Sequence, residues 1–246
     1  MNPMVNLKPH PQRSTCSACS LREQCLPAGL GALEINTVDR LIHLRRTVAQ
    51  GELLFRNHAP LQSLYAIRTG FVKTRLPHPD GGEQVMGFHL PGDLLGLDAL
   101  GDGRPLCDAV ALETSDVCEI PVTALSLLLR KIPSLQQQFH RIMSREIAHD
   151  HRMMLLLGSL RAPERLAAFL LNLSQRYAAR GYSQAEFMLH MTRADIGSHL
   201  GLTLETVSRE LSRLRAGKLI EVQSRLIRIT DMAGLTSAAR CGAGKT

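Results

Sequence analysis

The stretch from Thr192 to Ile229 constrains the fold most, because few folds accommodate two short helices, a glycine turn and two strands in that order. Thr192 is suited to cap the first helix through its hydroxyl, and Asp195 adds negative charge at the positive end of that helix. Gly201 supplies the turn, and the helical pattern resumes over residues 204–216. Two apolar segments follow as the strands of a wing. This order is typical of a winged helix-turn-helix domain.

The second helix of this pattern has one apolar and one polar face. The apolar face is expected to pack in the core, and it consists of Leu204, Val207, Leu211 and Leu214. In a helix-turn-helix the second helix enters the major groove of DNA. There Arg209 can donate to guanine O6 and N7, Glu205 can accept from cytosine N4, and Ser208 can do either. Glu205 and Arg209 could instead form an ordinary surface ion pair. The predicted DNA contacts are Thr203, Glu205, Ser208, Arg209 and Arg213.

Positive charge is concentrated in the same region of the chain. Residues 161–246 hold 13 Lys and Arg against 7 Asp and Glu, whereas the first 160 residues are nearly balanced, and the whole chain carries +7. Such a local excess is expected where a domain meets phosphates. We therefore predict a DNA-binding domain over 161–236 and a tail over 237–246. The tail ends in Gly244-Lys245-Thr246, which mimics a phosphate-binding loop, but that loop needs a following helix, so we expect no enzyme.

The middle of the chain reads as a β-rich domain over residues 33–122. Short apolar runs such as 63–67 and 70–75 are separated by glycines and are expected to be strands. Asp80-Gly81 is a strong hairpin signal because glycine adopts the positive φ that such turns need. Several short strands at this spacing predict a β-sandwich or jelly roll. Together with the helical parts, the chain is expected to belong to the α+β class.

A long helix is expected to follow, within a dimerisation segment over residues 123–160. Pro133 suits a first helical turn, and apolar residues then recur at coiled-coil spacing. The predicted dimer interface consists of Met143, Ile147, Asp150, Met154 and Leu157. Asp150 would face its own copy across a two-fold axis, where two carboxylates repel each other. The alternative is that this stripe packs inside its own domain.

Three cysteines, Cys16, Cys19 and Cys25, lie within ten residues in a polar N-terminal segment over 1–32. Thiolates at this spacing are typical metal ligands, and a four-ligand site needs one more from Cys107, Cys118 or a histidine. Zinc accepts four cysteines, or three and a histidine, and would make a static structural site. A [4Fe–4S] cluster accepts four cysteines and would make a reactive one. The spacing leaves both metals open.

The sequence also limits where the protein works. No apolar run approaches the roughly 20 residues that cross a bilayer. The first residues lack the charged and apolar regions of a signal peptide. We therefore expect a cytoplasmic protein without membrane contact, in a compartment where cysteines stay reduced and bind metal more often than they form disulfides.

Five stretches of the chain together resemble the CRP/FNR superfamily of transcription regulators, and specifically its FNR/ANR branch of oxygen-responsive iron–sulfur proteins. These stretches are CSACSLREQCLP (16–27), GFHLPGD (87–93), ALETSDVCEIP (111–121), MTRADIG (191–197) and ETVSR (205–209). The resemblance extends from about Ser14 to Leu235. It implies a β-roll sensor domain, a long dimer helix and a winged helix-turn-helix.

The resemblance also implies a mechanism. Cys118 becomes the fourth ligand of a [4Fe–4S] cluster that promotes homodimerisation and DNA binding, and oxygen destroys the cluster and switches the protein off. The recognition helix is expected to read a palindrome of TTGAT-type half-sites, and the β-roll to contact RNA polymerase. No cyclic nucleotide is expected, because residues 104–107 lack the Arg-Ser pair that would bind its phosphate. The chain departs from the branch at Gln24, where an apolar residue is typical, and at the extra Cys107. A zinc-stapled, constitutive DNA binder is the alternative.

Overall fold

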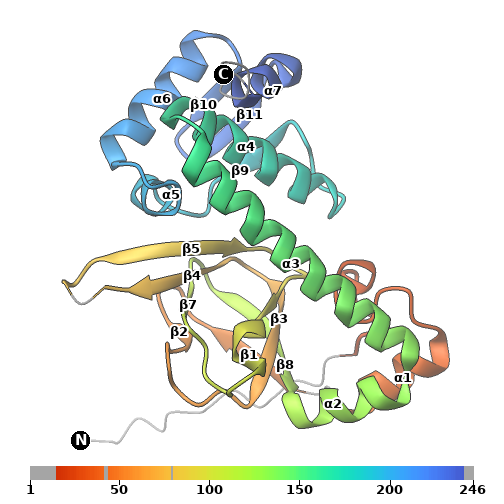
Figure 1. Ribbon diagram of the computed structural model, residues 1–246. Helices are drawn as coiled ribbons and strands as arrows, with labels where there is room; N and C mark the ends of the chain where they lie inside the picture. Colours follow the sequence, from red (N-terminus) through yellow and green to blue (C-terminus); the bar gives the residue numbers. More distant parts are fainter. Residues whose placement is uncertain (1–14, 42–43, 79, 241–246) are drawn as a thin grey trace, which may run out of the picture.

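The computed structural model describes residues 15–41, 44–78 and 80–240. It consists of a β-roll with the N-terminal segment packed beside it, a long helix that crosses the molecule, and a C-terminal helical domain with a small sheet (Figure 1). This architecture confirms the predicted α+β class and its order of parts. Residues 1–14 and 241–246 lie outside the described part of the chain, and the second range includes the Gly244-Lys245-Thr246 end of the predicted tail.

Two four-stranded antiparallel sheets form the β-roll. The first has the order β1 (Leu44–Val48), β8 (Ser115–Pro121), β3 (Ser63–Thr69) and β6 (Leu94–Leu95). The second has the order β2 (Leu53–Phe55), β7 (Asp108–Ala111), β4 (Val72–Pro77) and β5 (Glu83–His89). Apolar side chains from both sheets fill the space between them, among them Val48, Leu54, Ile67, Val72, Ala109 and Val117. The β-roll therefore has a core of its own.

Two glycine turns of the β-roll have conformations that a side chain would disturb. Gly81 has φ +82° between β4 and β5, so the predicted hairpin is confirmed. Gly70 has φ +86° between β3 and β4, and a Cβ added there would lie 2.2 Å from Ser115 Oγ. Glycine is required at this second turn for both backbone and steric reasons.

Among the described residues, four short helices accompany the β-roll. They are η1 (Arg22–Gln24), α1 (Ala32–Leu41), η2 (Leu97–Leu100) and α2 (Val122–Lys131). The predicted long helix is confirmed as α3 (Pro133–Ser159), and the separate helix α2 precedes it within the predicted segment 123–160, with Ile132 between the two. Pro133 lacks the N–H that a continuous helix would use, and it fits the first turn of a new one. The first turns of α3 bury Leu135 and Phe139 in a core shared with the β-roll.

The C-terminal domain has the predicted helix-turn-helix. Its helices are α4 (Ala162–Ala178), α5 (Arg193–Leu200), α6 (Leu204–Ala216) and α7 (Met232–Arg240), and its sheet has the order β10 (Ile220–Gln223), β11 (Leu226–Ile229) and β9 (Glu186–Met188). Thr192 caps α5 and forms a capping box with Asp195, as expected. Gly201 has φ +63° in the turn. A Cβ on Gly197 would lie 2.7 Å from the Leu202 carbonyl oxygen, so glycine allows the two helices to pack closely.

Three features of this domain differ from the prediction. Strand β9 and helix α7 were not expected, and α7 passes through the predicted boundary at residue 236 with Leu235 fully buried. Leu204 was expected in the core but is 47% exposed. It is the first residue of α6, where the helix has not yet reached the core that buries Val207, Leu211 and Leu214.

The C-terminal domain packs on the β-roll through a shared apolar core, to which the β-roll contributes Phe71, Val85, Phe88 and Leu90, and through polar contacts. Lys73 of β4 forms an ion pair with Asp195 of α5 at 2.6 Å. Asp93 of the β-roll accepts from Arg176 in the last turn of α4 at 2.6 Å and from Arg180, just after that helix, at 2.5 Å. In the part of the chain that the structure describes, no helix is long and apolar enough to cross a membrane.

Candidate metal centre and nucleic-acid interface

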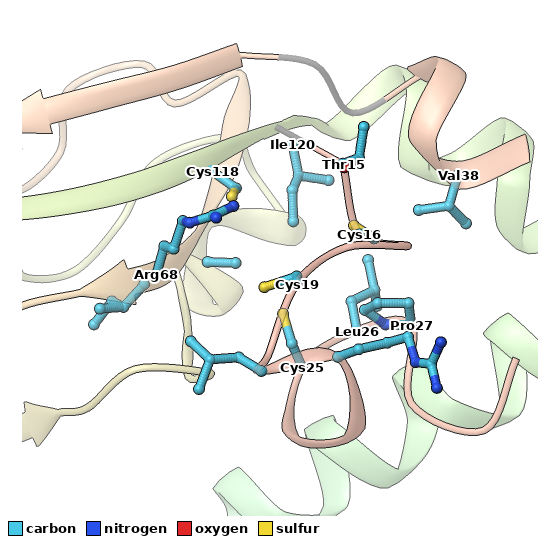
Figure 2. A pocket seen from close by; sticks show the side chains of 14 residues that line it. Thr15, Cys16, Cys19, Cys25, Leu26, Pro27, Val38, Arg68, Cys118 and Ile120 are labelled. Carbon is cyan, nitrogen blue, oxygen red and sulfur yellow. The ribbon is translucent and has the colours of Figure 1, made fainter. Parts of the chain in front are cut away.

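Four cysteines from two distant parts of the chain line one pocket. Cys16, Cys19 and Cys25 come from the N-terminal segment, and Cys118 comes from β8 (Figure 2). Alternation along β8 decides the position of Cys118: Val117 faces the core between the sheets, so Cys118 faces outward. Apolar residues such as Leu26, Val38 and Ile120 form much of the remaining wall. The structure therefore brings together the four predicted ligands.

The fifth described cysteine lies elsewhere. Burial raises the pKa of Cys107 to about 11, and the charges of Asp98 and Asp108 add to the increase. Cys107 is not among the residues that line the four-cysteine pocket. The structure therefore places Cys107 outside the group of predicted ligands.

Hydrogen bonds fix the cysteine segment to two helices. The backbone N–H groups of Cys16 and Ser17 donate to the carboxylate of Asp39 in α1. The side chain of Gln138 in α3 donates to the Cys25 carbonyl oxygen at 3.4 Å, and Gln138 is only 4% exposed. The cysteine segment thus touches the helix that is predicted to form the dimer.

Gln24 joins the same segment to the C-terminal domain. Its Nε2 donates to the Ala179 carbonyl oxygen at the end of α4 at 3.0 Å. Its Oε1 is buried without a hydrogen-bond partner among the described residues. The space beside Gln24 is narrow, because a Cβ on Gly92 would lie 3.3 Å from Gln24 Cβ. A residue next to a predicted ligand is therefore in direct contact with the DNA-binding half of the molecule.

The pocket raises the pKa of two of its thiols, those of Cys16 and Cys25. Burial raises the pKa of Cys25 to about 12, and Cys118 and Cys19 add to the increase while a backbone N–H from Leu26 opposes it. Burial likewise raises the pKa of Cys16, with further contributions from Cys25 and Asp39. These mutual effects are consistent with the shared pocket that the four cysteines line. A metal held here must displace the thiol protons, because cysteine binds metals as thiolate.

The donor set matches that of a [4Fe–4S] cluster, which is held by four cysteine thiolates. In the described residues, no three His, Cys, Asp or Glu side chains are grouped as the ligands of a metal ion. The candidate metal centre is thus identified by the chemistry of its donors, which are four thiols around one largely apolar pocket. It is not identified by a preformed coordination geometry.

The polar face of α6 is exposed as predicted. Thr203 caps α6 by accepting from the Thr206 N–H at 3.2 Å, and Glu205 follows in the first turn. The side chains of Arg209 and Arg213 are 63% and 67% exposed. Ser208 accepts a hydrogen bond from Arg193 of α5 at 3.1 Å. The predicted DNA contacts therefore lie together on one accessible surface.

Sequence reasoning missed the partner of these arginines. The alternative interpretation was a surface ion pair between Arg209 and Glu205. Arg209 instead pairs with Glu210, and its Nε lies 3.4 Å from Glu210 Oε1. Arg213 Nη1 lies 3.2 Å from Glu210 Oε2. The signal in the sequence was a glutamate between Val207 and Leu211, at a position that helical periodicity places at the edge of the buried face.

The predicted dimer stripe is partly exposed in the single chain. Ile147 is 52% exposed, Met154 69% and Leu157 36%, and Asp150 is exposed beside them. Met143 packs against the core that the first part of α3 shares with the β-roll. Apolar side chains in such numbers on one long helix are typical of a surface that another molecule covers.

Comparisons with known proteins agree with this architecture. Residues 45–131 match the family model of the cyclic nucleotide-binding domain, and residues 164–238 match that of the Crp-like helix-turn-helix domain. The chain is 48% identical to the "Anaerobic regulatory protein" of Pasteurella multocida, over 89% of this chain and 81% of that one. It is 46% identical to the "Fumarate and nitrate reduction regulatory protein" of Escherichia coli, over 91% of this chain and 90% of that one.

A solved structure supports the same assignment. FixK2 from Bradyrhizobium japonicum superimposes with a TM-score of 0.73 at 30% identity, over 79% of this chain and 96% of that one. A β-roll joined through a long helix to a winged helix-turn-helix defines a transcription regulator with separate sensory and DNA-binding domains. The chain belongs to the CRP/FNR family of transcription regulators. That family consists of DNA-binding regulators, so the prediction that the chain is not an enzyme is confirmed.

Proposed function

We propose that this chain is an anaerobic transcription regulator that responds to oxygen through a [4Fe–4S] cluster bound by Cys16, Cys19, Cys25 and Cys118. The observation that carries the proposal is the meeting of these four cysteines in one pocket, three from a local motif and one from a strand about 90 residues away. The names of the relatives from Pasteurella multocida and Escherichia coli point to the same physiology.

The protein's own residues supply the setting for the cluster. Leu26, Val38 and Ile120 limit the access of water to the pocket, and Asp39 fixes the backbone at Cys16. When bound, the cluster supplies a centre that oxygen degrades, which makes its presence a measure of oxygen. Because Gln138 holds Cys25 against α3, occupancy of the pocket is expected to influence the exposed part of that helix.

The output is the dimer and its binding to DNA. The proposed homodimer interface of the cluster-loaded state consists of Met143, Ile147, Asp150, Met154 and Leu157. Burial of apolar side chains favours association, whereas Asp150 opposes it by meeting its own copy. The protein is then poised close to its dimerisation threshold. A two-fold dimer carries two α6 helices and suits a palindromic site.

In each protomer, α6 is proposed to bind a TTGAT-type half-site. The contacting residues are Thr203, which caps the helix, Glu205, Ser208, Arg209 and Arg213. Such a regulator works in the cytoplasm and contacts RNA polymerase through its β-roll. The missing Arg-Ser pair at residues 104–107 argues that the β-roll binds no cyclic nucleotide, although it is built on the domain named for that ligand.

The first test is anaerobic purification, followed by a visible spectrum and analysis of iron and sulfide before and after exposure to air. We expect a brown protein with about four iron and four sulfide per chain that bleaches in air. A colourless protein with one zinc would overturn the oxygen-sensing proposal and leave a zinc-stapled DNA binder.

A matched pair of variants tests the ligand set. Cys118→Ser should lose most of the iron, because it removes a proposed ligand from the pocket. Cys107→Ser is the control: it makes the same change at a thiol outside the pocket and should keep the wild-type iron content. Loss of iron in the second variant and not in the first would reverse their roles.

A further inference from the structure

Glu210 is a charged residue on the inner side of the recognition helix. It is 3% exposed, and its neighbours Val207, Leu211 and Leu214 are buried in the core of the C-terminal domain. A carboxylate removed from water in apolar surroundings is costly unless a partner compensates for it. Its position therefore calls for an explanation in terms of its partners.

The partners of Glu210 are two arginines on the DNA-facing side of α6. Arg209 Nε lies 3.4 Å from Oε1, and Arg213 Nη1 lies 3.2 Å from Oε2. Arg209 also donates from Nη2 to Thr206 Oγ1 at 3.3 Å. The carboxylate is 4% exposed, whereas the two arginine side chains are 63% and 67% exposed. Glu210 thus holds both guanidinium groups from the protein side while most of each arginine remains accessible.

This arrangement affects recognition because arginine is a flexible side chain. Ordering a free arginine costs rotamer entropy. A guanidinium that is already held in place loses less freedom when it forms a bidentate contact with guanine. The same carboxylate offsets part of the positive charge of the two arginines, and so reduces attraction to phosphates that carry no sequence information.

We propose that Glu210 is a positioning residue that orients Arg209 for base readout and weakens indiscriminate phosphate binding through Arg209 and Arg213. The inference rests on the proposed function, since it assigns Glu210 a part in reading the DNA site. Glu210 does not touch DNA in this scheme; it acts through the arginines. It increases the ratio between specific and non-specific affinity rather than the affinity itself.

The test substitutes Glu210→Gln, which keeps the size of the side chain and removes its charge. The control is Glu221→Gln, which also removes one negative charge from this domain and breaks a carboxylate–arginine contact, that with Arg228 at 3.2 Å. Cluster-loaded protein is titrated anaerobically into two labelled duplexes, and binding is followed by fluorescence anisotropy. One duplex carries the TTGAT-type palindrome, and the other has the guanine of each half-site replaced by adenine.

Discrimination is the ratio of the two dissociation constants. We expect Glu210→Gln to lower this ratio about tenfold, a change within the range of a bidentate arginine–guanine contact, mainly by strengthening binding to the altered duplex. Glu221→Gln should leave the ratio within about twofold of wild type. In an Arg209→Ala background, Glu210→Gln should change the ratio much less, because Arg213 is then the only arginine of the pair through which it acts.

The outcomes separate the inference from the proposed function. If wild-type protein binds both duplexes equally, the proposed DNA reading is wrong. If wild type discriminates and Glu210→Gln keeps the wild-type ratio, the positioning role is wrong. Thermal unfolding of each variant is measured in parallel, and Glu210→Met provides a second uncharged variant. If neither variant folds, Glu210 serves the stability of the domain, and the inference is likewise overturned.

Discussion

Two adjacent residues of α3 offer a stringent test of the proposed dimer. Met154 and Leu155 are similar in size and are 69% and 66% exposed in the single chain. Successive residues of a helix point about 100° apart, so only Met154 lies on the predicted stripe with Ile147 and Leu157. Met154→Ala should weaken the cluster-loaded dimer, and Leu155→Ala should not.

The magnitude follows from the exposure of Met154. Full burial of a methionine side chain contributes about 2 kcal/mol, and 69% of this side chain remains to be buried. Truncation to alanine keeps the Cβ atom, so the loss is about 1 kcal/mol per copy. The residue occurs twice in a two-fold dimer, so the total is about 2 kcal/mol, or a factor of about 30 in the dissociation constant.

Sedimentation equilibrium under anaerobic conditions measures this constant directly, at matched iron content for all three proteins. The reasoning assumes that the stripe is buried between two copies of α3. Equal effects of the two variants would refute it, because an unspecific loss of apolar surface would then explain both. A stronger effect of Leu155→Ala would place the interface on the other side of α3.

Three further predictions concern other parts of the molecule. Burial and two nearby aspartates raise the pKa of Glu146 to about 7 from 4.5, so the folded chain binds more protons than the unfolded one between these values and loses stability as the pH rises through them. Glu146→Gln should therefore increase the free energy of unfolding at pH 8, by at most about 3 kcal/mol, and change it little near pH 4, as measured by urea unfolding. Gly70→Ala should cost at least about 2 kcal/mol in the same assay, because its Cβ would meet Ser115 and its φ is positive. Gln24→Leu removes the hydrogen bond to Ala179 and places an apolar side chain beside the pocket. It should slow the loss of iron in air, and an unchanged rate would show that the amide gives oxygen no easier access.

Local signals made the helix-turn-helix predictable. The cap at Thr192, the capping carboxylate of Asp195 and the glycine at 201 each depend on residues a few positions apart, and all three are confirmed. Strand β9 was missed because three residues carry no periodicity of their own and pair only with β11. Leu204 was misplaced because periodicity gives the direction of a face but not the point at which a helix meets the core.

The candidate metal centre was also predictable from the sequence only in part. The spacing of Cys16, Cys19 and Cys25 made them candidate ligands, and all three line the pocket. The residues alone could not choose between Cys107 and Cys118, because that choice depends on which strand lies beside the N-terminal segment. Only the alternation along β8 and its place in the sheet put Cys118 there. The contacts of Glu210 could not be predicted either, because they depend on the conformations of the Arg209 and Arg213 side chains, which residue spacing does not specify.

The origin of the four cysteines has a consequence for engineering. Three come from a contiguous peptide, but the fourth is built into the pleat of β8, and the peptide is tied to α1 and α3 by hydrogen bonds. Transfer of the N-terminal segment alone to another protein is therefore not expected to transfer the metal centre. A graft onto another β-roll would have to carry along an outward-facing cysteine on the matching strand, an acceptor for the backbone at Cys16 and a donor to the carbonyl of Cys25.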